Sequence, residues 1–228
     1  MTRKKTKNKV INRKPCIFYL MRHGESEGNV NHILQGQNND SQLTDNGILQ
    51  AQQRAKQLSH VKFDLAFSSD LIRAHKTAQI VASEHQLAVK TSRLLREMTF
   101  GRYDGKKVDE FFAELRDLLD EHYQLSPELR FKHKVKPDIE SDEEMMARLI
   151  TFLRQTALAY PGKTALVVSH GAIIRTLLIH LGWGSYEELA HGAIKNTGYM
   201  VLQSVGVEFK VLETVGIEKQ DPSLGVDH

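Results

Sequence analysis

Short apolar runs alternate with amphipathic stretches along this chain. Residues 16–21 and 65–69 are compact runs typical of buried strands, and residues 88–98 predict a third strand. Between the first two, residues 43–60 predict a helix with Thr44 as N-cap and Ile48, Ala51, Ala55 and Leu58 on one face. A second helix carries Leu71, Ala74, Ala78 and Val81. The pattern indicates strands interleaved with helices.

The second half continues this alternation after a polar, partly helical middle at about residues 101–137. Ser141 and Glu144 form a capping box before a helix with Met145, Leu149, Phe152 and Thr156 directed inward. Residues 164–169 predict a strand, residues 172–182 a helix, and residues 197–205 and 207–215 a hairpin that turns at Gly206. We therefore predict an α/β fold, a three-layer α/β/α sandwich with a mostly parallel central sheet.

Length and charge favour one domain with a basic N-terminal tail. The chain has 228 residues, enough for one sizeable core. Seven cations precede the first acidic residue, and without them 24 of the 31 basic residues remain against 28 acidic ones. We expect a basic disordered tail at 1–14, a globular domain at 15–216 and a flexible C-terminal tail at 217–228. The mildly acidic body favours neither a nucleic-acid partner nor a membrane partner.

The single cysteine, Cys16, excludes an internal disulfide and fits a reducing compartment. The apolar run at 16–21 is too short for a secretory signal, and no stretch of the sequence approaches membrane-spanning length. The expected location is the cytoplasm.

Polar residues gather where the predicted strands end. Arg22, His23 and Gly24 follow the first strand, Ser68 and Ser69 lie just before Arg73, and Ser169, His170 and Gly171 follow the strand at 164–169. In open α/β sheets, ligands bind beyond the carboxyl ends of the strands. We expect the two histidines and the two arginines to meet at one point.

These two histidines and two arginines are suited to binding and transferring a phosphoryl group. Arginine forks bind phosphate oxygens, and helix N-termini add N–H donors. A neutral histidine can attack phosphorus to give a phosphohistidine, which water then cleaves. A carboxylic acid must protonate the leaving oxygen, and Glu97, at another predicted strand end, is the candidate. Taken singly, each of these residues also has a purely structural explanation.

Five sequence blocks resemble one family in order and spacing: LMRHGESEGN, QLTDNGILQA, FSSDLIRAHKTA, LREMTFGRYDG and LVVSHGAIIR. They are similar to the motifs of the histidine phosphatase superfamily, the phosphoglycerate mutase-like proteins, over about residues 17–202. The resemblance implies a phosphohistidine enzyme without metal or other cofactor. It implies His23 as nucleophile, Glu97 as acid and then base, and a phosphate pocket built from Arg22, Asn29, Arg73, His170 and Gly171.

Within the family, the choice lies between hydrolase and mutase. The mutases resemble RHGESEWN, whereas this chain has Gly28 in place of the tryptophan. Its middle segment SPELRFKHKVKPDI also differs from their proline-rich stretch. We expect hydrolysis of a small phosphorylated metabolite, with a mutase and a non-catalytic phosphate-binding protein as alternatives. The oligomeric state is left open.

Two short motifs match other classes of phosphate-binding protein, but the residues around them argue against both. Cys16 and Arg22 have the C-x5-R spacing of cysteine phosphatases, but the bulky residues between them are strand-like. Residues 160–164 imitate the end of a P-loop, but Ala157 replaces its first glycine and the match precedes a strand. The eleven histidines include no H-E-x-x-H pair, so no metal site is expected.

Cations in the middle of the chain could serve a second anionic group on the substrate, if they face the site. They are equally explained as a solvated surface. These cations are Arg102, Lys106, Lys107, Arg130, Lys132, Lys134 and Lys136.

Overall fold

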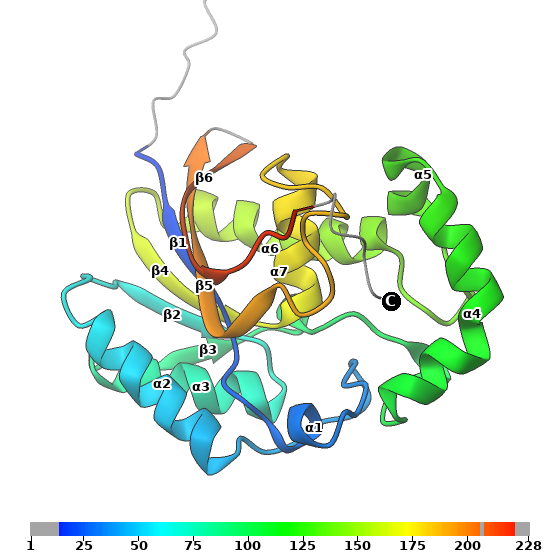
Figure 1. The fold of residues 1–228 in the computed structure, drawn as a ribbon. Helices are drawn as coiled ribbons and strands as arrows, with labels where there is room; N and C mark the ends of the chain where they lie inside the picture. The colour runs from blue at the N-terminus through cyan, green and yellow to red at the C-terminus, as the bar shows by residue number, and fades with distance from the viewer. Residues whose placement is uncertain (1–13, 206–207, 222–228) are drawn as a thin grey trace, which may run out of the picture.

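A six-stranded sheet forms the centre of the computed structural model, which describes residues 14–205 and 208–221 (Figure 1). The strand order is β3-β2-β4-β1-β5-β6. The strands are β1 (Ile17–Arg22), β2 (Leu65–Ser68), β3 (Val89–Thr91), β4 (Thr164–Ser169), β5 (Ile194–Val205) and β6 (Glu208–Ile217). The first four in spatial order are parallel, whereas β5 and β6 are antiparallel to their neighbours. The mostly parallel sheet is confirmed.

Helices cover both faces of this sheet. Helices α2 (Asp45–Gln57) and α3 (Ile72–Ser83) pack on one face, and α6 (Asp142–Ala159) and α7 (Gly171–His180) pack on the other. The side chains of β1 alternate between the two cores, with Phe18 and Leu20 toward α6 and α7 and Met21 toward α2 and α3. This period of two follows from the pleat of a strand. The predicted three-layer sandwich is therefore confirmed.

The predicted helix starts are also confirmed. The Thr44 hydroxyl accepts the N–H of Gly47 at 3.0 Å. Ser141 and Glu144 form the reciprocal capping box, with bonds of 3.2 and 3.0 Å. All four inward positions of α6 named above are buried. Local hydrogen bonding thus begins both helices where the sequence places them.

The third strand is much shorter than predicted. β3 ends at Thr91, and a 3-10 turn, η1 (Arg93–Leu95), follows it. The Ser92 hydroxyl accepts the N–H of Leu94 at 3.3 Å and competes with strand pairing. Leu95 is then turned fully into the core. Glu97 therefore follows a turn and not the end of a strand.

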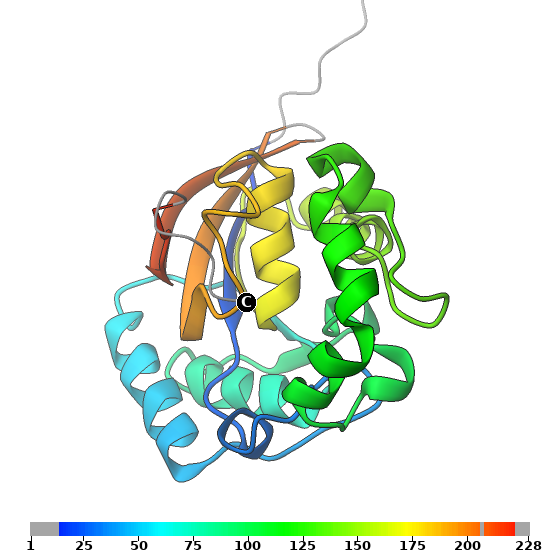
Figure 2. The same ribbon diagram turned by 45° about the vertical axis from the view of Figure 1, so that its right-hand side comes forward.

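The middle of the chain stands beside the sandwich. It consists of η2 (Gly101–Tyr103), α4 (Val108–Gln124) and α5 (Pro127–Lys132), and Figure 2 shows α4 and α5 alongside α7. Helix α4 contributes to a small separate hydrophobic core, which consists of Tyr103, Phe111, Leu115, Leu119 and Ile139. The short helix α1 (Glu27–Val30) lies after β1.

The predicted tails fall largely outside the described residues. Of residues 1–14, only Lys14 is described, and the hairpin turn at Gly206 and residues 222–228 also lie outside. Ile217, which the sequence analysis assigns to the C-terminal tail, is the last residue of β6. The N–H groups of Glu218 and Gln220 donate to the carbonyls of Ala193 and Glu188 at 3.0 and 2.9 Å. The packed chain therefore continues past residue 216.

Among the helices of residues 14–205 and 208–221, none has the length and apolar character needed to cross a membrane.

Candidate active site

Two parallel strand ends bring His23 and His170 together. Arg22 at the end of β1 is in register with Ser169 at the end of β4, and the next residue on each strand is a histidine. The two rings meet edge to face, with centroids 5.3 Å apart. The two strand-end histidines are therefore adjacent.

A hydrogen bond to the backbone sets the tautomer of His23. Its Nδ1 lies 2.7 Å from the carbonyl oxygen of Gly24. Because a carbonyl oxygen can only accept, Nδ1 carries the proton and Nε2 keeps its lone pair. Burial, together with the cations Arg73 and Arg22, lowers the pKa of His23 well below 6.5. The ring is neutral at pH 7, which is the form that a nucleophile requires.

Three hydrogen bonds fix the backbone of His23 and Gly24. The Gly24 N–H donates to the Thr77 hydroxyl at 3.0 Å, and the His23 carbonyl accepts from the Thr197 N–H and the Asn196 Nδ2 at 3.2 and 3.1 Å. A Cβ on Gly24 would lie 2.5 Å from the carbonyl oxygen of Gly47, so only glycine fits this crossing. Sequence reasoning missed Asn196, because only the pairing of β5 with β1 brings it here.

Arg73 is fully buried and Arg22 is half-buried, and each keeps an N–H without a partner in the part of the chain that the structure describes. Arg22 donates through Nη1 to the Ile194 carbonyl at 2.5 Å, and Arg73 donates through Nη1 to Asp40 Oδ1 at 3.1 Å. The Arg73 Nη2 donates to the Gln35 carbonyl at 3.2 Å. Neither Nε has a hydrogen-bond partner among the described residues. These contacts fix both guanidinium groups and leave one buried N–H on each.

His170 adds two more nitrogens without partners. Its side chain is fully buried, and neither ring nitrogen has a hydrogen-bond partner in the described part of the chain. Burial, followed by the charges on Arg73 and the neighbouring His23, lowers its pKa well below 6.5. Buried polar groups are almost always paired, so the two arginine Nε–H groups and the single N–H of neutral His170 indicate a site for an anion near His23.

Backbone amides hold the Glu97 carboxylate. It accepts the N–H of Met98 at 2.9 Å and, from the first turn of α7, those of Ala172 and Ile173 at 3.0 and 3.3 Å. Gly171 opens that helix, and a Cβ there would lie 3.4 Å from Arg22 Nε. The start of α7 therefore positions the carboxylate, and Arg22 packs against Gly171.

Arg148 of α6 clamps the segment that carries Glu97. Its NH1 donates to the carbonyls of Leu94 and Arg96 at 3.0 and 2.5 Å, and its NH2 to that of Glu97 at 3.0 Å. Its Nε forms an ion pair with Glu140 at 2.7 Å. Sequence reasoning missed Arg148, since its place in the helix reads as an ordinary polar position.

Asn29 also lines the cavity around His23. Its Oδ1 accepts from the Ser26 N–H at 3.1 Å and from Asn196 Nδ2 at 3.3 Å. The Nδ2 amide is therefore the part of Asn29 left for a ligand.

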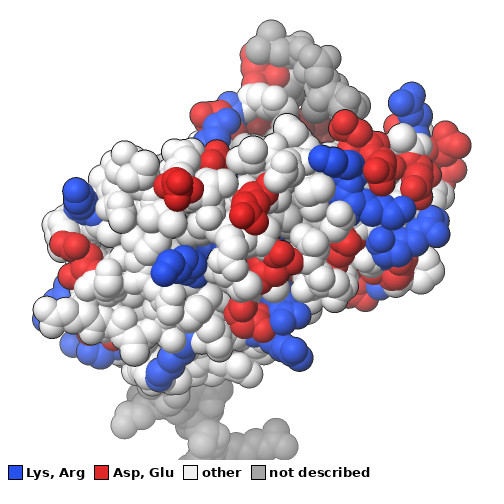
Figure 3. Space-filling view, turned by 90° about the horizontal axis from the view of Figure 1, so that it is seen from below, with Lys and Arg blue, Asp and Glu red and all other residues white. Residues whose placement is uncertain are grey.

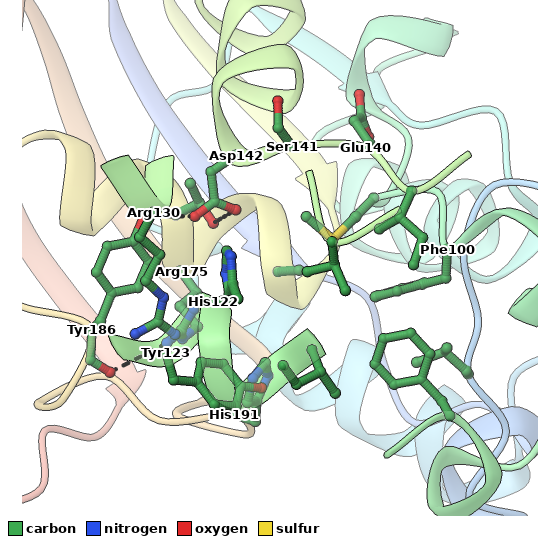
Figure 4. Close-up of a pocket in the computed structure, with 18 of the residues that line it drawn as sticks. Phe100, His122, Tyr123, Arg130, Glu140, Ser141, Asp142, Arg175, Tyr186 and His191 are labelled. Atoms are coloured by element: carbon green, nitrogen blue, oxygen red, sulfur yellow. Dashed lines mark hydrogen bonds between the residues drawn. The ribbon is translucent and has the colours of Figure 1, made fainter. Parts of the chain in front are cut away.

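These residues enclose a cavity of about 190 Å³. A larger chamber of about 360 Å³, lined in part by residues of α4, lies next to it (Figure 4). His170 is the one predicted site residue that does not line the smaller cavity, and its ring contacts that of His23 edge to face. The cavity is lined by the other predicted site residues, Arg22, His23, Asn29, Arg73, Glu97 and Gly171.

Cys16 is remote from this cavity. It precedes β1 whereas Arg22 ends it, and six strand residues span about 20 Å. Burial, with a smaller contribution from Asp64, raises the pKa of the Cys16 thiol to about 11. The C-x5-R spacing is thus the length of a strand and not a phosphate-binding loop. Within residues 14–205 and 208–221, no cluster of three or more His, Cys, Asp or Glu residues is arranged to hold a metal ion.

Of the seven cations in the middle of the chain, Arg130 is the one that lines either cavity. Arg102 and Lys106 pair with Glu114, Lys134 pairs with Glu144, and Lys107 donates to the Asn31 carbonyl. Most of this group therefore belongs to the surface.

Comparison with known proteins identifies the family. Residues 18–215 match the family model of the histidine phosphatase superfamily (branch 1). The chain is 31% identical over 208 residues to a 2,3-bisphosphoglycerate-dependent phosphoglycerate mutase of Xanthobacter autotrophicus, covering 86% of this chain and 95% of the relative. It is 30% identical over 166 residues to the adenosylcobalamin/alpha-ribazole phosphatase of Escherichia coli, covering 72% and 78%.

Among solved structures, phosphoglycerate mutase from Bacillus anthracis superimposes with a TM-score of 0.72 at 27% identity, covering 90% of this chain and 95% of that one. The fold, the strand-end histidines and the sequence match agree. The chain belongs to the histidine phosphatase superfamily (branch 1).

Proposed function

We propose that this protein is a phosphomonoester hydrolase that acts through a phosphohistidine on His23. The observation that carries the proposal is the group of buried nitrogens around His23 that lack partners: Arg22 Nε, Arg73 Nε and both ring nitrogens of His170. A phosphoryl group would supply acceptors for the two arginine Nε–H groups and for the single N–H of neutral His170, and the arginines would meet its negative charge. The substrate is a small-molecule phosphate ester.

The reaction proceeds in two displacements. In the first, His23 Nε2 attacks phosphorus, the ester P–O bond breaks, and protonated Glu97 gives its proton to the departing oxygen. In the second, the Glu97 carboxylate takes a proton from water, the water oxygen attacks phosphorus, and the P–N bond breaks. Inorganic phosphate leaves, and His23 and Glu97 return to their starting forms.

The packing of Gly28 against Gln35, which lines the cavity, supports hydrolysis over mutase chemistry. Where the mutases carry tryptophan, this chain has Gly28, and a Cβ there would lie 2.2 Å from the Gln35 side chain. Gln35 also donates to the Ser26 hydroxyl at 2.9 Å, and its own carbonyl receives Arg73. A tryptophan would displace Gln35 and disturb Arg73. This departure from the mutase motif supports the hydrolase, because Gly28 leaves the space that Gln35 occupies.

Surface charge supports a small-molecule substrate over a nucleic acid. On the face shown in Figure 3, basic and acidic side chains are interspersed. Nucleic-acid interfaces instead gather basic residues in one patch or stripe. We also propose a cytoplasmic location, since the single Cys16 suits a reducing compartment.

The test separates the two steps by the leaving group. His23→Ala should abolish phosphate release from every ester. Glu97→Gln should lower turnover of alkyl phosphates about 10²–10⁴-fold, because an alkoxide needs the proton. It should retain much more of the transfer rate on p-nitrophenyl phosphate, whose phenolate leaves unprotonated, and show a burst of nitrophenol before slow hydrolysis. A fully active His23→Ala would overturn the mechanism.

A second measurement distinguishes hydrolase from mutase. The protein is incubated with a labelled phosphate ester in the presence and absence of 3-phosphoglycerate, and the products are separated. A hydrolase releases labelled inorganic phosphate at the same rate in both mixtures. Transfer of label to the phosphoglycerate in preference to water would favour the mutase.

A further inference from the structure

The larger chamber opens directly into the cavity around His23. Leu34, Phe100, Ala172 and His191 line both spaces, as do Arg22 and Arg175. At about 360 Å³, the chamber has nearly twice the volume of the cavity that holds the phosphate-binding groups. A substrate with its phosphate at His23 would therefore extend the rest of its structure into this chamber.

One side of the chamber is aromatic and apolar. Phe111 and Phe112 of α4 and the neighbouring Phe100 line it, and the ring of Phe111 meets those of Phe100 and Phe112 edge to face at 5.6 and 5.5 Å. Interlocked rings of this kind form a rigid apolar wall. A three-carbon, strongly hydrated alcohol would leave most of this wall without contact.

The other side carries the cation singled out above. In Figure 4, Arg130, Tyr186 and Tyr123 lie together, across the chamber from Phe100. The Arg130 guanidinium stacks 4.0 Å from the Tyr186 ring centroid and 4.8 Å from that of Tyr123. Its Nε is buried and has no hydrogen-bond partner among the described residues. The stacking holds the cation in place while a donor is left for a ligand.

The nearby carboxylate of Asp142 does not accept a hydrogen bond from Arg130 Nε. Asp142 accepts from the hydroxyls of Tyr186 and Thr176 at 2.7 and 3.3 Å, so its oxygens are already engaged. Arg175 brings a second cation to the same side and donates to the carbonyls of Leu189 and Tyr186. Arg130, Arg175 and Asp142 line this side of the chamber opposite the apolar wall, whereas Glu187, which also interacts with both arginines, is not part of the lining.

Resting on the proposed function, we infer that the alcohol half of the substrate is a ring-sized, largely apolar group with a carboxylate at the end remote from the phosphate. The apolar wall contacts the ring, and Arg130 binds the carboxylate. The chamber thereby selects aryl or cyclic phosphate esters with a second, distant anion over short phosphorylated acids and alcohols.

The experiment compares matched esters. The probes are 4-carboxyphenyl phosphate and 4'-carboxybiphenyl-4-yl phosphate, each beside its neutral carboxamide, with phenyl phosphate as the unsubstituted reference. In the wild-type protein, kcat/KM should be at least about tenfold higher for the better carboxylate than for its carboxamide, because a hydrogen bond to a charged group gives discrimination of this size. The isosteric pair keeps the apolar contact constant, and the comparison of wild type with Arg130→Met cancels the difference in leaving-group acidity between the two esters.

Arg130→Met keeps an unbranched apolar side chain on the tyrosines but removes the donors. It should lower kcat/KM for that carboxylate about ten- to hundredfold and change the carboxamide less than about threefold. The matched control is Lys132→Met on the exposed side of the same helix, which should alter neither. Val135→Phe, which reduces the chamber, should lower kcat/KM for the biphenyl esters while phenyl phosphate is still hydrolysed.

The outcomes separate this inference from the proposed function. Suppose that phenyl phosphate is hydrolysed through His23, but Arg130→Met lowers kcat/KM equally for the carboxylate and the carboxamide esters. The chamber inference is then wrong, and the proposed hydrolase function still holds. Wild-type protein without preference for either carboxylate also overturns it. If no ester is hydrolysed, the proposed function fails. Calorimetry with the corresponding aryl phosphonates then decides the chamber inference, because Arg130→Met should weaken binding of the carboxylated phosphonate alone.

Discussion

Replacing Arg148 by methionine should destabilise the protein and misplace Glu97. The side chains of Arg148 and its partner Glu140 are only 14% and 10% exposed. The change leaves a buried carboxylate without its cation and removes the donor from the carbonyls of Leu94, Arg96 and Glu97. Glu140 keeps two longer bonds, from Gln37 Nε2 and the Thr99 N–H, each at 3.3 Å.

Breaking a buried ion pair by removing one partner costs about 3–5 kcal/mol. For a chain of this length, each kcal/mol corresponds to about 2–4 °C in Tm, so a fall of about 6–20 °C is expected. Equilibrium urea unfolding followed by far-UV circular dichroism measures the free energy of unfolding. The matched control is Arg93→Met, whose side chain is 81% exposed and lies 3.6 Å from Asp70. It should change the stability by no more than about 0.5 kcal/mol.

A double-mutant cycle with Glu140→Gln makes the test specific. Once the buried carboxylate is neutral, losing Arg148 should cost less, so the double variant should be more stable than the sum of the single losses predicts. Additive losses, or a loss in Arg148→Met no larger than in the control, would refute the reasoning. Activity per folded molecule provides a second readout, since a displaced Glu97 should slow alkyl esters more than p-nitrophenyl phosphate.

Three further outcomes are expected. Cys16→Ser should retain most of its turnover per folded molecule on p-nitrophenyl phosphate, because this buried thiol lies about a strand's length from His23; a thousandfold fall would favour a cysteine nucleophile. Turnover should survive EDTA, since arginines and histidines meet the phosphate charge; loss that a divalent metal restores would contradict this. Burial, with the charge on Arg130, lowers the pKa of His122 to about 4, so the unfolded chain takes up a proton below pH 6.5 that the folded chain refuses. Stability should therefore fall from pH 6.5 toward pH 4, and urea unfolding of His122→Gln should show a smaller fall; an unchanged fall would show that other groups cause it.

Much of the fold could be predicted from the sequence because its determinants are local. The apolar runs of β1, β2 and β4 and the capping residues Thr44 and Ser141 act within a few residues along the chain. Their order alone requires an α/β sandwich with the strand ends at one edge. The apolar pattern at residues 88–98 predicts a longer third strand than the structure contains. The hydrogen bond to the Ser92 hydroxyl and the burial of Leu95 end the strand earlier.

The candidate site divides in the same way. Arg22, His23 and His170 could be located because they lie at the end of a strand or directly after it. Arg73, Asn29, Glu97 and Gly171 could be located because they sit in recognisable blocks. Arg148 and Asn196 could not, since each reaches the site from an element distant in sequence and carries no local signal. The same holds for the choice of Arg130 among seven similar cations.

The sequence by itself determined the elements, their order and the chemical groups at the strand ends, since these depend on periodicity and on neighbours in the chain. Only the tertiary structure decided which nitrogen of His23 is free, which arginine donors lack partners, and that a chamber with an aromatic wall and a stacked Arg130 adjoins the phosphate cavity. Those properties depend on burial and on hydrogen bonds between residues far apart in the chain, which come into existence only when the sheet and the helices pack.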